Sequence, residues 1–145
     1  MQPQVSVAGR QPDGWVDKTM IVYSAPPAPG QAIAPNIVIA RDALGADETF
    51  RDYCNRQIEG FRATLPHFLR EEEGAGRVRE HDAFQIRFLW QSGAGMLRQR
   101  VFFIAADAGV VVTYTATAAA DDYAAHEPVF ERGLAELVVA PAARH

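Results

Sequence analysis

The chain has a single cysteine, Cys54, among its 145 residues, so it cannot form an internal disulfide. No metal-ligand spacing surrounds Cys54, and we interpret it as a small core residue rather than a reactive thiol. No stretch approaches the ~18 uninterrupted apolar residues of a membrane span. The amino terminus also lacks the basic start and apolar run of a secretory signal. We therefore expect a cytoplasmic protein.

Clustered positive charge is missing as well. The chain has 14 Lys and Arg against 18 Asp and Glu, a net charge of -4. Because neutralising phosphates requires clustered basic residues, this balance argues against a nucleic-acid partner. Arg77, Arg79, Arg98 and Arg100 come closest together, and we interpret them as solvated faces of strands.

A catalytic centre would need a nucleophile with a base, paired acids or grouped metal ligands. Gly93-Ala94-Gly95 lacks the third glycine of a dinucleotide loop, and the run Glu71-Glu72-Glu73 is typical of a solvated face. The histidines lie too far apart in the sequence to predict a metal site: His67, His81, His126 and His145. We predict no enzyme, with no catalytic residue, metal or cofactor.

Strands are predicted by β-branched and apolar segments at residues 18–23, 36–42, 68–72, 83–91, 96–105 and 110–117. Glycine-bearing turns at residues 74–76, 92–95 and 107–109 indicate antiparallel hairpins, and His81-Asp82 is interpreted as part of a turn. Serial apolar residues in 36–42 predict burial on both faces of that strand. In 83–91 the apolar residues alternate, which predicts one core face and one face toward water or a partner: Phe84, Ile86, Phe88 and Trp90.

Helices are predicted at residues 47–65, with Asp47 as N-cap and Pro66 as the stop, and at 121–139. The order of strands and helices predicts an α+β fold, an antiparallel sheet flanked by two main helices. We expect one domain over residues 1–145, with a tail from about residue 140. Gln57 lies near the centre of the first helix's apolar stripe. Its amide either bonds to the sheet beneath or is left at an apolar surface for an incoming ligand.

Five short motifs occur in order along most of the chain. They are Pro12-Asp13-Gly14-Trp15-Val16-Asp17, Val38-Ile39-Ala40-Arg41-Asp42, Tyr53 with Arg56-Gln57 and Leu65-Pro66, Leu97-Arg98-Gln99, and His126-Glu127-Pro128. This succession resembles DcrB-related proteins, which share the PsbP-like fold. One subgroup, the Eag chaperones, is encoded beside type VI secretion effectors.

The resemblance implies a homodimeric cytoplasmic chaperone. Such a chaperone binds the amino-terminal transmembrane helices of an effector that carries a PAAR region, shields them from water and helps to load the effector for export. Carried over from the family, the client-binding residues are Met20, Val22, Val38, Gln57, Phe61, Leu65 and Gln99.

The sequence leaves two questions open. Arg100 occupies the place where the family has a glutamine, and Gln99 stands one residue earlier; a one-residue shift moves a strand side chain to the other face. The alternative functions are a DcrB-like envelope accessory protein and a small-molecule binding protein of the same fold.

Overall fold

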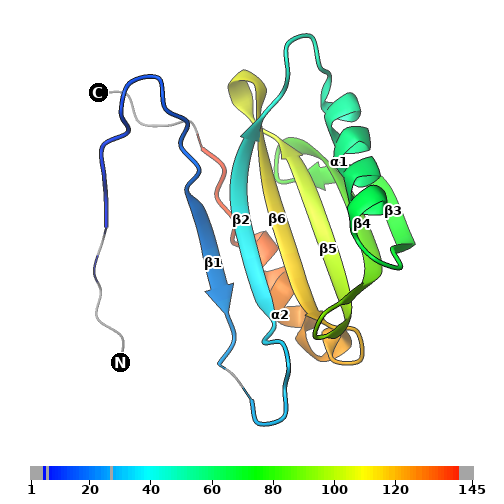
Figure 1. Ribbon diagram of the computed structural model, residues 1–145. Helices are drawn as coiled ribbons and strands as arrows, with labels where there is room; N and C mark the ends of the chain where they lie inside the picture. The colour runs from blue at the N-terminus through cyan, green and yellow to red at the C-terminus, as the bar shows by residue number, and fades with distance from the viewer. Residues whose placement is uncertain (1–4, 6, 27, 141–145) are drawn as a thin grey trace.

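Six antiparallel strands form one sheet with a helix on each face (Figure 1). The computed structural model describes residues 5, 7–26 and 28–140. Across the sheet the strand order is β1-β2-β6-β5-β4-β3, which confirms the α+β antiparallel fold. In chain order the elements are β1 (Met20–Ser24), β2 (Asn36–Ala43), α1 (Phe50–Thr64), β3 (Leu69–Val78), β4 (His81–Ser92), β5 (Gly95–Ala105), a 3-10 turn (Asp107–Gly109), β6 (Val110–Ala119) and α2 (Tyr123–Ala135).

The first core lies between α1 and the sheet. The apolar positions of β4 face this helix, as their alternation predicted, and Cys54 is buried among them. Burial raises the pKa of the Cys54 thiol to about 11, so it stays protonated at neutral pH. The fully buried members are Tyr53, Cys54, Ile58, Ile86, Phe88, Val101, Phe103 and Val111.

The second core lies on the opposite face, beneath α2. The Tyr114 hydroxyl donates a 2.7 Å hydrogen bond to the carbonyl oxygen of Phe130 and so ties β6 to the helix. Arg79 donates to the carbonyl oxygens of Leu137 and Ala135, at 2.9 and 2.7 Å. These bonds satisfy carbonyls that lie at and beyond the carboxyl end of α2. Arg79 therefore caps a helix; it is exposed, as predicted, but lies in the turn between β3 and β4 and not in a strand.

Both helix boundaries differ from the predicted ones. The N-cap of α1 is Thr49, whose side chain accepts a 3.1 Å hydrogen bond from the backbone N–H of Asp52. Asp47 has a φ of 61° and lies in the preceding loop, so its prediction as N-cap is wrong. α2 ends at Ala135 because the chain turns to bury Leu137. The tail was predicted from about residue 140. Ala140 is described, and the rest of the tail lies outside the described residues.

β3 is longer than predicted, and the turn predicted at Gly74-Ala75-Gly76 is wrong. Gly74 pairs with Gln85 and Gly76 with Ala83, inside the β3–β4 ladder. The reversal comes later, at Arg79, whose φ is 56°. His81 and Asp82 consequently begin β4 instead of forming a turn.

Expected burial on both faces of β2 is also incorrect. Ile37 and Ile39 pack into the core beneath α2. Val38 and Ala40 alternate with them and point to the other face, where they belong to neither core.

Gly133 tests the packing of α2. A Cβ at Gly133 would overlap the Tyr114 hydroxyl and lie 3.2 Å from Ile37 Cδ1, so Gly133→Ala should destabilise the protein by about 1–3 kcal/mol. Gly60, in α1, has no atom within 4 Å of such a Cβ, and Gly60→Ala should stabilise by roughly 0.5–1 kcal/mol. Thermal and urea unfolding measure both changes. A Gly133→Ala protein as stable as wild type would contradict this packing.

Candidate functional site

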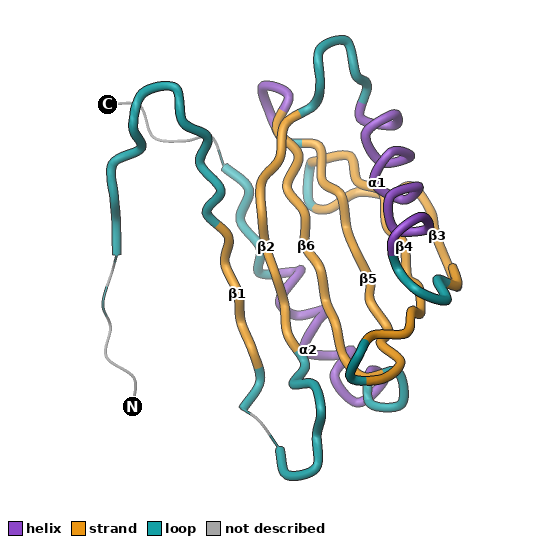
Figure 2. The backbone as a smooth tube through the Cα atoms, in the orientation of Figure 1, coloured by secondary structure: helices purple, strands orange, loops and turns teal. Residues whose placement is uncertain are grey.

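α1 covers only part of its face of the sheet. At one end the Tyr53 hydroxyl donates a 2.8 Å hydrogen bond to Asp42 on β2. Toward its other end Phe61 packs on Phe88 of β4 and Phe103 of β5, with ring centroids 5.2 and 6.4 Å apart. Figure 2 shows α1 beside β3 and β4, away from β1 and β2. The rest of this face is left without a covering helix.

Register defines which side chains occupy this uncovered area, because directly paired residues point to the same face. Val22 pairs with Val38, and Val38 with Thr115, so one row crosses three strands. Gln99 pairs with Thr117 and extends the area onto β5. We call this area the open face; its members are Met20, Val22, Ser24, Asn36, Val38, Ala40, Gln99, Thr113, Thr115 and Thr117.

The open face is apolar at one edge and polar at its centre, with no charged member. Met20 and Val22 are each 57% exposed. Threonines occupy its β6 positions, where their hydroxyls alternate with buried alanines of the other face. An uncharged surface with scattered hydroxyl and amide groups suits an apolar partner that also carries some polar groups.

Four of the predicted client-binding residues lie on the open face: Met20, Val22, Val38 and Gln99. The register also separates Gln99 from Arg100. Gln99 lies on the same side as Val101 of the α1 core, whereas Arg100 points to the opposite face. Gln99, and not Arg100, therefore lies on the α1 side of the sheet.

The client-binding residues predicted on α1 divide into two groups. Phe61 and Leu65 pack against the core beneath the helix. Gln57 is half-buried, and among the described residues no hydrogen-bond partner is found for its amide. Because Gln57 follows Tyr53 by one helical turn, it lies on the flank that faces β2, and Gly60 continues that flank. The sequence did not predict that Gly60 lies on this flank of α1. Its placement follows from the direction of the Tyr53 side chain in the structure.

Gln99 belongs to a chain of side-chain hydrogen bonds across three strands. The Trp90 indole N–H donates to Gln99 Oε1, and Gln99 Nε2 donates to Thr117 Oγ1 at 2.8 Å. Indole nitrogen can only donate, which fixes the direction of the amide. The sequence pattern identified Trp90 as a core residue alone and gave no signal of this bond.

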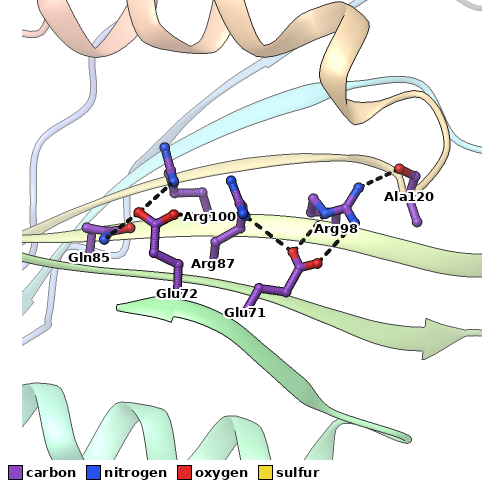
Figure 3. Close-up of polar contacts among 7 residues, drawn as sticks. All are labelled: Glu71, Glu72, Gln85, Arg87, Arg98, Arg100 and Ala120. Atoms are coloured by element: carbon purple, nitrogen blue, oxygen red, sulfur yellow. Dashed lines mark hydrogen bonds and ion pairs between the residues drawn. The ribbon is translucent and has the colours of Figure 1, made fainter. Parts of the chain in front are cut away.

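The opposite face carries a charged cluster instead (Figure 3). A β-bulge between Arg70 and Glu72 directs Glu71 and Glu72 toward arginines on the neighbouring strands. Arg98 binds both Glu71 oxygens, at 2.8 and 3.0 Å, and the carbonyl oxygen of Ala120 at 2.7 Å. The Arg98 hydrogen bond lowers the pKa of Glu71.

Arg87 and Arg100 complete this cluster. Arg87 Nε lies 3.3 Å from Glu71, and Arg100 donates to Glu72 at 3.2 Å. The glutamate run is exposed, as predicted, whereas Arg98 and Arg100 are half-buried and ion-paired, so their interpretation as solvated residues is wrong. The bulge, which turns two consecutive glutamates to one face, is the feature that the sequence pattern did not indicate.

A cavity of about 660 Å³ lies on the other flank of α1, between the helix and β3, and α1 separates it from the open face. Its walls mix acids and bases, including Arg51, Glu59 and Arg70, with no grouping that suggests a reaction. Within the described residues no group of three or more His, Cys, Asp or Glu could hold a metal ion, and no helix is long and apolar enough to cross a bilayer.

Comparison with known proteins identifies the family. The DcrB family model matches residues 10–135. This chain belongs to the DcrB family. It is 32% identical over 131 residues to Effector EagT6 of Pseudomonas aeruginosa, covering 90% of this chain and 89% of that protein. The family predicted from the five motifs is therefore confirmed.

Solved structures share this fold. A P. aeruginosa protein, PA94, has a TM-score of 0.79 and 29% identity, with 90% of each chain covered. LpqN of Mycobacterium tuberculosis gives 0.63 at 18% identity, over 81% and 68% of the two chains. The PsbP of Synechocystis gives 0.51 at 11% identity, over 77% and 76%, which confirms the predicted PsbP-like fold.

The two glutamines should respond differently to substitution. Gln99→Ala leaves the Trp90 N–H and the Thr117 hydroxyl without their partner and should cost about 1–3 kcal/mol of stability. Gln57→Ala removes no hydrogen bond of the described residues, so the free protein should unfold within roughly 0.5 kcal/mol of wild type. Urea unfolding of both variants measures this. An equal, large loss of unfolding free energy in both variants would show that the Gln57 amide supports the core.

Proposed function

We propose that this protein is a cytoplasmic chaperone of a type VI secretion effector that carries a PAAR region. It binds the effector's apolar amino-terminal helices on the open face, shields them from water and helps to load the effector for export. The observation that carries the proposal is an uncharged, partly apolar sheet face without a covering helix, on a DcrB family member related to Effector EagT6.

Energetics favour an apolar helix as the partner. A released transmembrane helix exposes far more contiguous apolar surface than a dissolved protein tolerates. Burying that surface against Met20, Val22 and Val38 stabilises the complex by roughly 25 cal/mol per Å². Gln57 and the threonines of β6 can then bond small polar side chains of the client that would otherwise lack partners.

One copy is too short to cover a whole membrane helix. From Asn36 to Asp42 the floor spans about 20 Å at ~3.4 Å per residue, whereas 20 helical residues span about 30 Å. A second copy paired edge to edge would widen the open face across the strands, so that both protomers contact the client. We therefore propose a homodimer in which the site is completed by both protomers.

β1 is the edge that suits such pairing. β3, the other edge strand, is blunted by a bulge and by charged residues along its length. β1 has no charged residue, and its central residues are exposed on both faces: Met20, Ile21, Val22 and Tyr23 are 46–60% exposed. Antiparallel pairing of two β1 strands would place both open faces on the same side of a continuous sheet.

The client-binding proposal is tested by charge. Val22→Asp or Val38→Asp puts an unpaired carboxylate against an apolar helix, so recovery of a co-expressed effector fragment should fall at least about tenfold. The matched control is Val129→Asp on α2, because Val129 is 57% exposed, as Val22 is. It should leave recovery unchanged, and all three variants should keep near-native melting temperatures. Undiminished recovery with Val22→Asp and Val38→Asp would refute client binding on the open face.

The dimer is tested by sedimentation at micromolar concentration, where the wild-type protein should have twice the 15.9 kDa mass of the chain. Replacing Ile21 and Tyr23 together by Lys adds like charges near the two-fold axis on the face away from the client. This variant should sediment as a monomer with its fold intact by circular dichroism. A monomeric wild type would contradict the homodimer, and a dimeric double variant would contradict pairing through β1.

A further inference from the structure

We propose that the open face binds an apolar client helix in one direction, with the helix's amino-terminal end at Asp42 and its carboxyl-terminal end at Gln99 and Thr117. This inference rests on the proposed chaperone function and adds a polarity to it. The observations behind it are a carboxylate at one end of the open face and a set of fixed hydrogen-bond donors at the other.

Asp42 is a carboxylate at the end of β2 without a direct ion pair among the described residues, although Arg56 lies near enough to act on it electrostatically. Its carboxylate accepts hydrogen bonds from the neutral Tyr53 hydroxyl and from the backbone N–H of Ala43, each at 2.8 Å. Burial, followed by the Asp42 contact, raises the pKa of Tyr53, so this hydroxyl remains a donor. The positive end of a helix dipole and its first free N–H groups favour an anion at this position.

Two other carboxylates near this end are already paired. Asp17 binds Arg41 at 2.6 Å, and Glu48 binds Arg56 at 2.8 Å. Their hydrogen bonds, led by Thr19 for Asp17 and Arg56 for Glu48, lower the pKa of each acid to about 2. Asp42 thus remains as the anion that faces the open surface from the end of β2.

The opposite end offers donors. The Gln99 carbonyl is occupied by the Trp90 N–H, and one Gln99 amide hydrogen is given to Thr117. The second amide hydrogen of the half-buried Gln99 is left for an acceptor, while the buried Thr117 holds the amide in place. The last turn of a helix presents carbonyl oxygens that lack intrahelical partners, and these are acceptors of the required kind.

The spacing matches a helix. Asn36 pairs with Thr117, and Asp42 lies six residues farther along β2, which is about 20 Å or the length of ~13 helical residues. A helix of that length reaches both ends at once; in a full span of about 20 residues, one end reaches its site and the other extends beyond the open face. In the reverse direction its free carbonyls would face the Asp42 carboxylate, and its free N–H groups would meet donors at Gln99.

Disulfide cross-linking tests the direction. Ala40→Cys marks the Asp42 end, and Ser24→Cys, which lies beside Asn36, marks the Gln99 end. The probe is a Leu/Ala peptide of about 14 residues with blocked ends and a cysteine at either terminus. Native Cys54 can stay, because it is buried and its pKa is raised to about 11.

The peptide with the amino-terminal cysteine should give roughly 3- to 30-fold more cross-linked product with Ala40→Cys than with Ser24→Cys. The peptide with the carboxyl-terminal cysteine should show the reverse preference. This ratio is the one expected from favourable dipole interactions at both ends of the helix. Adding Asp42→Asn, which keeps an acceptor for Tyr53, should reduce this ratio. Equal or inverted preferences would overturn the direction while leaving client binding intact. No cross-linking in any combination would overturn the proposed function as well.

Discussion

A helix is about 10 Å wide, whereas six strands span about 24 Å, so one helix cannot cover a face of this sheet. The position of α1 follows from Tyr53, whose ring edge packs on Phe103 at 5.9 Å and whose hydroxyl reaches Asp42. α2 is held on the other face by Tyr114 and Arg79. Each helix consequently leaves part of its face open; on the α2 side the open part includes the charged cluster and the exposed Ile21 and Tyr23 of β1.

The two open parts differ in what fills them. On the α2 side, Glu71 and Glu72 bind three arginines, and Arg98 also reaches the loop before α2. Paired charges resist burial by an apolar partner, because they would have to leave water. On the α1 side the corresponding area has valine, methionine, threonine and amide groups without charge. Side-chain chemistry, more than shape, therefore decides which open part can receive an apolar helix.

Local patterns in the sequence were sufficient for the strands, the helices and the faces of β4, since these depend on alternation and helical period. Features set by pairing between distant segments could not be predicted in this way. The bulge before Glu72 and the glycines inside β3 depend on register with β4. Whether Gln99 or Arg100 faces α1 likewise depends on a one-residue choice of register. The site residues on β1 and β2 came from the family resemblance, because exposed valines on a strand do not by themselves indicate a partner.

Gln57 and Gln99 show why the polar groups of an apolar surface matter. Both are half-buried amides beside the open face, yet Gln99 is bonded within the protein and Gln57 has no partner among the described residues. In the free protein water can solvate Gln57 at little cost. A bound client would exclude that water, and an unpaired amide would then cost about 1–3 kcal/mol. A uniformly apolar helix would incur this cost, whereas a helix with a hydroxyl or small polar residue at that point would not. The open face thus discriminates between clients through the group it leaves unbonded.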